Sequence, residues 1–343
     1  MQIRARAPLR LGLAGGGTDL SPYCEEFGGA VLNATIDLYA YATLEPISGD
    51  RVHFVAKDAG FEESDSALPD DIAISGKAIL HRAVYKAITR RFLGGKAYPC
   101  RLTTFCEAPP GSGLGSSSTM VVALVKAFVE ALALPLGEYD IARLAFEIER
   151  VDAGLQGGRQ DQYAATFGGF NFMEFYAQDR VIVNPLRIKR WILSELEASI
   201  VLFYTGVSRS SAAIIAEQAQ NISDHSAPPL AAMHQLKSDA YAMKEAVLKG
   251  DFRAFASVLN RSWQAKKQTA ASISNPRIEH LMDTAMGAGA IAGKVSGAGG
   301  GGFITFIIDP LARMSVMRRL ADEEGRVLAC SFTKDGTQGW RIE

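Results

Sequence analysis

The chain has 343 residues, of which 48% are hydrophobic and 21% charged, and its formal net charge is −1. These values are ordinary for a globular protein with room for two domains, and they leave no need for crosslinks. The balanced charge and the lack of long Lys/Arg runs argue against a nucleic-acid or membrane partner, so a small-molecule ligand is expected.

Cysteine usage and the amino terminus indicate the compartment. The four cysteines form no C-x-x-C pair and the five histidines are dispersed, which argues against a zinc site or a disulfide framework. The segment from Met1 to Arg6 lacks the apolar core of a signal peptide, and no apolar run reaches membrane-spanning length. We therefore expect a cytoplasmic protein with reduced thiols.

Hydrophobic periodicity predicts mixed strands and helices in the first half of the chain. The expected elements are strands at 3–14, 30–44, 51–56 and 100–107, helices at 77–92, 120–134 and 139–151, and strands at 170–175 and 181–185. The helix at 120–134 is apolar on nearly every side, which predicts that it is buried between layers.

Beyond residue 187 the pattern changes. The expected elements are a strand at 199–205, three or four helices between Ser210 and Met286, strands at 290–295 and 303–308, a helix at 311–324 and a strand at 326–332. Strands split by helices, closing with a β-α-β unit, predict a ferredoxin-like domain. We expect an α+β protein with domains at residues 1–187 and 188–343.

The first candidate ligand-binding segment lies near the amino terminus, where an apolar strand runs into Gly15-Gly16-Gly17-Thr18-Asp19. Consecutive glycines let the backbone pass close to a ligand, and an aspartate suits the hydroxyl groups of a sugar. Arg10 lies inside the apolar strand. The alternatives are an edge position for Arg10 and a turn or helix cap for Asp19.

A glycine-dense loop precedes the apolar helix: Pro109-Pro110-Gly111-Ser112-Gly113-Leu114-Gly115-Ser116-Ser117-Ser118, here called the phosphate loop. Its backbone N–H groups, the positive end of the helix and the serine hydroxyls predict a site for a nucleotide polyphosphate and its Mg²⁺. The loop lacks the lysine of a P-loop and the G-x-G-x-x-G spacing of a dinucleotide-binding turn. The alternative is an ordinary glycine-rich turn before a core helix.

Two acidic residues follow at helix ends. Glu149 and Asp161 could converge across the intervening turn, one holding Mg²⁺ and the other facing the attacking hydroxyl. Phosphoryl transfer needs that division of labour. The alternatives are a salt bridge at a helix end for Glu149 and a helix cap for Asp161.

The last candidate segment is the glycine cluster, residues 297–302, which has five glycines in six positions and leads into a strand. So much glycine between apolar strands indicates a backbone that approaches a ligand or another loop. A flexible linker is the alternative.

In this order and spacing, the segments resemble the GHMP kinase superfamily over essentially the whole chain. The resemblance implies a domain like the second domain of ribosomal protein S5, a ferredoxin-like domain, and ATP in the cleft between them. It implies that the phosphate loop wraps ATP, that Ser117 and Glu149 hold Mg²⁺, that Asp161 is catalytic, that Arg10 assists the attacking hydroxyl, and that Asp19 holds sugar hydroxyls. The stretch Gly158 to Asp161 is one residue longer than the matching motif of mevalonate kinases.

Within the superfamily, the chain is most similar to kinases that phosphorylate the anomeric hydroxyl of D-glycero-D-manno-heptose 7-phosphate. The resemblance implies ATP and a sugar phosphate as partners and leaves room for a homodimer. The residues expected at the substrate are Gly16, Gly17, Thr18, Asp19, Arg159, Lys294, Gly299 and Gly300, with Arg159 and Lys294 as candidates for its distal phosphate. Another sugar-1-kinase, a catalytically inactive sugar and ATP sensor, and a mevalonate- or homoserine-like kinase are the alternatives.

Overall fold

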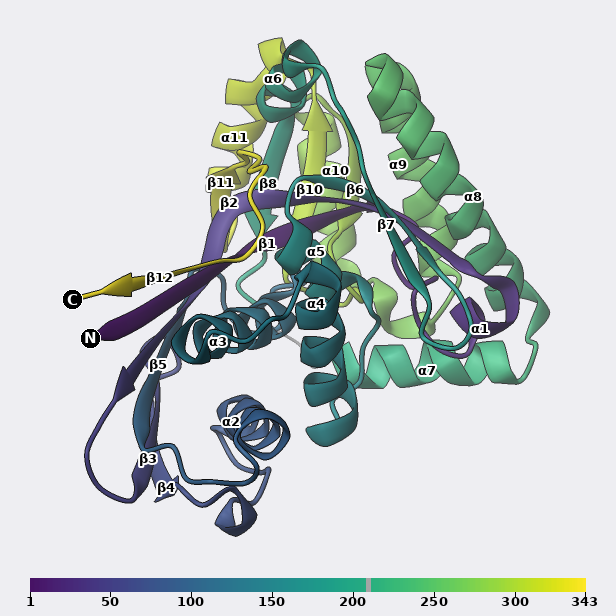
Figure 1. Ribbon diagram of the computed structural model, residues 1–343. Helices are drawn as coiled ribbons and strands as arrows, with labels where there is room; N and C mark the ends of the chain where they lie inside the picture. Colours follow the sequence, from purple (N-terminus) through teal and green to yellow (C-terminus); the bar gives the residue numbers. More distant parts are fainter. Residues whose placement is uncertain (208–210) are drawn as a thin grey trace.

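The computed structural model describes residues 1–207 and 211–343 (Figure 1). The strands are β1 (Gln2–Ala14), β2 (Gly29–Pro46), β3 (Arg51–Ala56), β4 (Phe61–Ser66), β5 (Cys100–Cys106), β6 (Phe170–Phe175), β7 (Val181–Pro185), β8 (Ile200–Tyr204), β9 (Ala290–Val295), β10 (Phe303–Ile308), β11 (Arg326–Ala329) and β12 (Gln338–Ile342). The α-helices are α1 (Tyr23–Phe27), α2 (Ile79–Phe92), α3 (Ser116–Leu132), α4 (Glu138–Phe146), α5 (Gln160–Phe167), α6 (Arg190–Ser199), α7 (Ser211–Ser223), α8 (Ala227–Lys249), α9 (Phe252–Lys267), α10 (Pro276–Gly287) and α11 (Arg313–Ala321).

The α+β class is confirmed, and most expected elements lie within a few residues of their predicted bounds. Helix α3 begins four residues earlier than expected, because its first turn is formed by the serines of the phosphate loop. The expected helix at 139–151 ends as an α-helix at Phe146 and continues as a π-helical turn, Glu147–Asp152. The predicted start of the second set of helices, Ser210, lies outside the described residues.

The first sheet follows the order β12-β1-β2-β5-β3-β4, with β6 paired to β2 and β7 to β6. The long strand β2 pairs with β6 through residues 29–34 and with β5 through residues 40–46, so it continues from one end of the sheet to the other. Helix α3 is buried against β1 and β2, as its all-round apolar character predicted (Figure 1).

The carboxyl end of the chain returns to the first sheet. Strand β12 pairs antiparallel with β1, joining residues 338–342 to residues 2–6, so the two termini lie side by side (Figure 1). The expected domain range 188–343 therefore differs from the structure at its end. An edge strand of five residues, none of them buried, has too little hydrophobic periodicity to be recognised from sequence.

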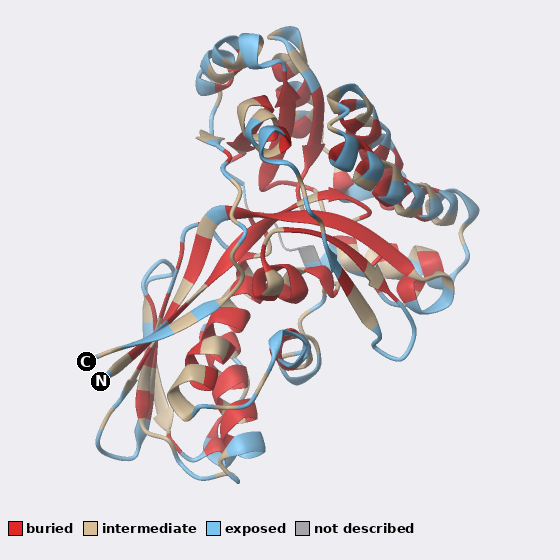
Figure 2. Cartoon of the chain, turned by 45° about the horizontal axis from the view of Figure 1, so that its top comes forward, coloured by how far each residue is buried: buried red, intermediate tan, exposed pale blue. Residues whose placement is uncertain are grey.

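The second sheet has the order β11-β8-β10-β9, all antiparallel, which is the ferredoxin-like arrangement expected. Its inner face shares an apolar cluster with β1, represented by Leu9 and Leu11 from the first sheet and Leu202 and Phe303 from the second. Figure 2 shows buried segments, in red, where the two halves of the chain meet. Across residues 1–207 and 211–343, no helix combines the length and apolar character needed to cross a membrane.

Candidate active site

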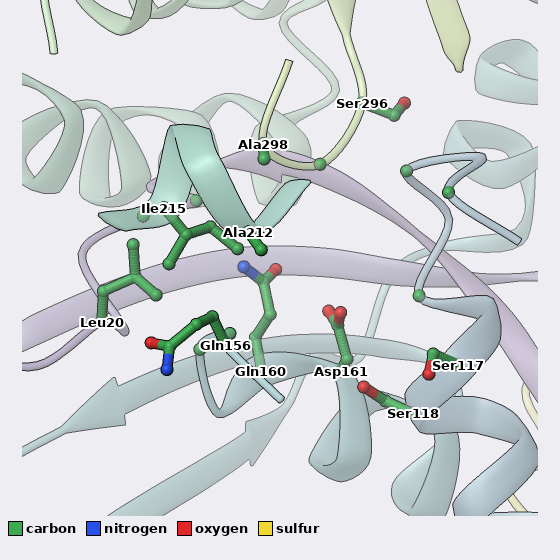
Figure 3. A pocket seen from close by; sticks show the side chains of 18 of the residues that line it. Leu20, Ser117, Ser118, Gln156, Gln160, Asp161, Ala212, Ile215, Ser296 and Ala298 are labelled. Carbon is green, nitrogen blue, oxygen red and sulfur yellow. The ribbon is translucent and has the colours of Figure 1, made fainter. Parts of the chain in front are cut away.

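A cavity of about 450 Å³ lies where the glycine motifs meet. Residues from β1, α3 and α5 line it from the first half of the chain, and residues from α7, α9 and the glycine cluster line it from the second. Figure 3 shows Asp161 pointing into this space, with Ser118 on one side and Ile215 on the other. Segments far apart in the sequence therefore face one volume.

Most of the residues predicted from sequence line this cavity. Those that do are Arg10, Gly16, Gly17, Asp19, Pro110, Gly111, Gly113, Gly115, Ser116, Ser117, Ser118, Glu149, Asp161 and Gly299. Those outside its lining are Thr18, Ser112, Leu114, Arg159, Lys294 and Gly300. The Thr18 hydroxyl instead lies 2.8 Å from the Gly15 carbonyl and 2.9 Å from the Ala30 carbonyl and accepts from the Ala30 N–H, which holds the amino-terminal turn in place.

The phosphate loop ends in an anion-binding geometry. Gly115 has φ 80° and directly precedes Ser116, the first residue of α3. No side chain caps this helix, so the N–H groups of its first turn are available to an anion. A Cβ at Gly115 would lie 3.3 Å from Cγ of Asp161, so glycine also lets the loop approach that carboxylate.

Arg10 and Asp161 form an ion pair at the centre of the site. Nη2 and Nε of Arg10 lie 2.6 and 2.7 Å from Oδ1 of Asp161, and Nη1 donates to the Gly113 carbonyl at 2.6 Å. Both carboxylate contacts use Oδ1, and Oδ2 accepts no hydrogen bond from any described residue. Arg10 thus fixes Asp161 against the phosphate loop and leaves one oxygen for a ligand.

Glu149 lies beside Ser118, a residue of the first turn of α3. The carboxylate is 1% exposed; its Oε2 accepts a 2.7 Å hydrogen bond from Gln162, and Nη1 of Arg150 lies 3.2 Å from its Oε1. Gln162 and Arg150 also donate to the Ser118 hydroxyl, each at 3.2 Å. Glu149 belongs to the π-helical turn, an irregularity that often marks a functional site.

These contacts bear on the expected metal site. Mg²⁺ is commonly held by one or two protein oxygens together with substrate phosphates, so a carboxylate and a hydroxyl at the phosphate loop fit it. Nε2 of Gln162 holds both of these groups in place, and its Oε1 is buried without a hydrogen-bond partner. The structure brings Ser118 into shared contacts with Glu149, whereas the sequence had pointed to Ser117.

Asp19 is 2% exposed and joins the amino-terminal turn to α5. Its Oδ1 accepts from the Gly17 N–H and the Gln160 side chain, and its Oδ2 accepts from the Gln160 N–H, all at 3.1 Å. A Cβ at Gly158 would lie 2.0 Å from Oδ2, so only glycine fits there. Asp19 therefore caps the start of a helix that is distant in sequence, while still lining the cavity.

The glycine cluster supports the phosphate loop. The Phe303 N–H, which directly follows the cluster, donates to the Ser112 carbonyl at 2.9 Å, and a Cβ at Gly302 would lie 2.4 Å from that same oxygen. A Cβ at Gly297 would lie 2.8 Å from Cα of Gly113. The cluster is thus an ordered loop with close backbone approach, which contradicts the flexible-linker alternative.

Two cations expected near the substrate have other partners. The Arg159 guanidinium is directed to Asp179 at 2.8 Å and Glu25 at 3.2 Å, away from the cavity. Nζ of Lys294 donates to the Gly12 carbonyl at 3.4 Å from a buried position behind the lining. Burial, with repulsion from Lys266 and Arg10, lowers the pKa of Lys294 to about 7.

Sequence reasoning missed Lys266 and the glutamines Gln160, Gln162 and Gln218. Lys266, at the end of α9, lines the cavity and donates to the Gly16 carbonyl at 3.2 Å. The positions of Gln160 and Gln162 on either side of Asp161 were a usable signal. Lys266 gave none, because a lysine pair at the end of an amphipathic helix usually faces solvent.

Comparison with known proteins agrees with this geometry. The chain matches the GHMP kinases N terminal domain over residues 79–169 and the GHMP kinases C terminal domain over residues 243–325. A D-glycero-alpha-D-manno-heptose 7-phosphate kinase of Campylobacter jejuni subsp. jejuni is 48% identical over 343 residues, covering 99% of each chain.

Solved structures give the same result. The crystal structure of a D-glycero-D-manno-heptose 1-phosphate kinase from Bacteroides thetaiotaomicron has a TM-score of 0.85 and 46% identity, covering 99% of each chain. The galactokinase of Lactococcus lactis, complexed with galactose, shares the fold at a TM-score of 0.77 and 16% identity, covering 98% of this chain and 95% of that one.

Proposed function

The chain belongs to the GHMP kinase family and is therefore an ATP-using phosphotransferase, and from this premise we propose that its acceptor is D-glycero-D-manno-heptose 7-phosphate. The reaction would phosphorylate the anomeric hydroxyl and give the 1,7-bisphosphate. This product would be a precursor of nucleotide-activated heptose, which is used in the synthesis of surface polysaccharide. The observation that carries this proposal is the 48% identity, over 99% of both chains, to a kinase named for that substrate. We also propose that the protein acts in the cytoplasm, as the sequence led us to expect.

The phosphate loop would bind the ATP phosphates. The uncapped first turn of α3 offers N–H donors and the positive end of the helix dipole to negatively charged oxygens. Ser116, Ser117 and Ser118 add hydroxyl donors at the same helix end. Because these groups are fixed by the buried helix, they need little reorganisation when phosphate charge shifts during transfer.

Asp161 would accept the proton of the attacking hydroxyl. The anomeric oxygen forms a bond to the γ-phosphorus, the bond to the β–γ bridging oxygen breaks, ADP leaves, and the hydroxyl proton passes to Oδ2 of Asp161. Arg10 holds the carboxylate through Oδ1 and keeps a positive charge near the transferring group. This arrangement supports an active kinase over an inactive sensor, which would need the pockets without the proton acceptor.

Glu149 with Ser118 or Ser117 would hold Mg²⁺ at the phosphate loop. When bound, this ion would neutralise part of the negative charge of the ATP phosphates. Arg150, which contacts Glu149 in the described structure, would stay close enough to contribute a second positive charge.

An acceptor panel tests the proposal. ADP release is measured with heptose 7-phosphate, heptose 1-phosphate, unphosphorylated heptose, galactose and mevalonate, and the product is examined by ³¹P NMR. We expect the highest kcat/KM with heptose 7-phosphate and a new phosphorus signal coupled to the anomeric proton. The 1-phosphate is included because the B. thetaiotaomicron structure is named for it.

The outcomes separate the candidates. Preference for the 1-phosphate would leave a heptose-phosphate kinase that acts at another hydroxyl. Preference for mevalonate or for an unphosphorylated hexose would overturn the heptose assignment while leaving the kinase family unaffected. No turnover with any acceptor would favour the sensor.

A further inference from the structure

The end of the cavity away from the phosphate loop has a distinct chemistry. Figure 3 shows Leu20 and Ile215 on the side opposite Ser117, with Gln160 between them and Asp161. Lys266 and Gln218 line the same cavity from α9 and α7. Lys266 contacts Gly16, which places its ammonium at the amino-terminal glycine motif rather than at the phosphate loop.

Among the described residues that line this cavity, Lys266 is the cation without a carboxylate partner. Arg10 is paired with Asp161 and Arg150 with Glu149. Among the described residues, Lys266 has no carboxylate oxygen within 4.0 Å, although it is only 3% exposed, and its protein partner is the Gly16 carbonyl. Asp19 compensates the charge of this buried ammonium only from beyond 4.0 Å, so an anionic ligand in direct contact with it gains further attraction.

The amide oxygens of Gln160 and Gln218, which line the same cavity, also lack partners, and the hydrogen-bond network fixes their orientation. The Thr269 hydroxyl donates its single proton to the Lys266 carbonyl, so it can only accept from Nε2 of Gln218, at 2.6 Å. The carboxylate of Asp19 likewise only accepts, so Gln160 presents Nε2 to it. Oε1 of both glutamines is consequently a buried acceptor without a donor.

A cation without a carboxylate partner and two unpaired acceptors indicate the chemistry of a ligand for this end of the cavity. Acceptor oxygens call for hydroxyl donors, and the ammonium calls for an anion, so the ligand is polyhydroxylated and carries a negative group. We propose that Lys266 binds the acceptor's own phosphate and thereby selects a sugar phosphorylated away from its reacting hydroxyl, while Gln160 and Gln218 accept from sugar hydroxyls. This inference rests on the proposed function and names the residue that binds the substrate's phosphate.

The charges around Lys266 are compatible with this role. Burial lowers its pKa to about 8 and the negative charge of Asp19 opposes that shift, so it is mainly protonated at pH 7. Its neighbour Lys294 faces Lys266, Arg10 and Asp239. A bound phosphate relieves the repulsion between the two lysines, which adds to the gain on binding.

The test compares Lys266→Met with Lys267→Met. Lys267 is the next residue of the same helix and pairs with Glu279 at 3.3 Å, outside the cavity lining, so it is a matched control. kcat and KM are measured for heptose 7-phosphate and for unphosphorylated heptose, and thermal unfolding is measured for each variant. Lys266→Arg, which keeps the charge, serves as the rescue variant.

We expect Lys266→Met to lower the ratio of kcat/KM for the phosphorylated acceptor to that for the parent sugar by about 10- to 100-fold, since a charge-assisted hydrogen bond is lost. The change should lie mainly in KM, Lys266→Arg should restore part of the ratio, and Lys267→Met should leave it unchanged. An equal loss with both acceptors, or no loss with either, overturns the inference while the kinase stands. If the wild type does not use heptose 7-phosphate, the proposed function fails and the inference fails with it.

Discussion

At the scale of single residues, the proposed mechanism depends on Asp161 as the proton acceptor. Asp161→Asn keeps the shape of the side chain but removes the proton acceptor, so kcat should fall by about 100-fold or more, as a positioned base typically contributes 10²–10⁴. ATP affinity, measured by equilibrium binding, should stay near that of the wild type because the phosphate loop is unaltered. A variant that keeps more than about half the wild-type rate, under conditions where chemistry limits turnover, would show that Asp161 is not the base.

The neighbouring serines of α3 differ in their contacts, which gives a matched pair of variants. Ser118 shares Gln162 and Arg150 with Glu149, whereas no such contact joins Ser117 to that carboxylate among the described residues. We expect Ser118→Ala and Glu149→Gln to raise the Mg²⁺ concentration needed for half-maximal rate at fixed ATP more than Ser117→Ala does. The reverse order would show that Ser117, rather than Ser118, holds the metal, as the sequence had indicated.

The glycine cluster acts at the scale of an element, by holding the phosphate loop. Gly302 has φ +81°, and a Cβ there would lie 2.4 Å from the Ser112 carbonyl oxygen. Gly302→Ala must therefore displace the phosphate loop, which we expect to raise KM for ATP by about tenfold and to lower stability by about 1–3 kcal/mol.

Gly60→Ala is the control, because Gly60 also has a positive φ, +66°, but no atom lies within 4 Å of the added Cβ. It should show a small loss of thermal stability and an unchanged KM for ATP. An equal effect of both variants on KM would mean that backbone strain, rather than the contact between the two loops, is responsible.

Lys294 matters at the scale of the whole molecule, because it lies on β9 and donates to the Gly12 carbonyl on β1, across the junction of the two halves. Its pKa is lowered from 10.5 to about 7, so above pH 7 the unfolded chain binds more protons at this residue than the folded protein does. The contribution of Lys294 to the free energy of unfolding should therefore rise between about pH 7 and 10.

Lys294→Met removes this dependence. The variant should be more stable than the wild type at pH 6–7, by up to a few kcal/mol because one pKa unit corresponds to about 1.4 kcal/mol, and the advantage should vanish towards pH 10. Denaturant unfolding at pH 6, 8 and 10 measures it. A variant less stable than the wild type at pH 6 would mean that the contact with Gly12 outweighs the cost of burying the charge.

The sequence by itself determined the local elements and the positions of the motifs. Strands 170–175, 181–185, 290–295 and 303–308 coincide with those of the structure, because their apolar runs are bounded by glycine, proline and charged residues. The phosphate loop was readable for the same reason, since a glycine loop before an apolar helix is a local feature. The α+β class and the kinase family followed from the order of such segments.

Tertiary structure alone decided what each side chain faces. Arg159 lies two residues from Asp161, yet its guanidinium pairs with Glu25 and Asp179 outside the cavity. Lys266 is more than 100 residues from Asp161, yet it lines the same cavity, and β12 joins the first sheet from the end of the chain. Periodicity reports burial along one element; partners, charge compensation and strand pairing depend on contacts between segments distant in sequence, which no local pattern encodes.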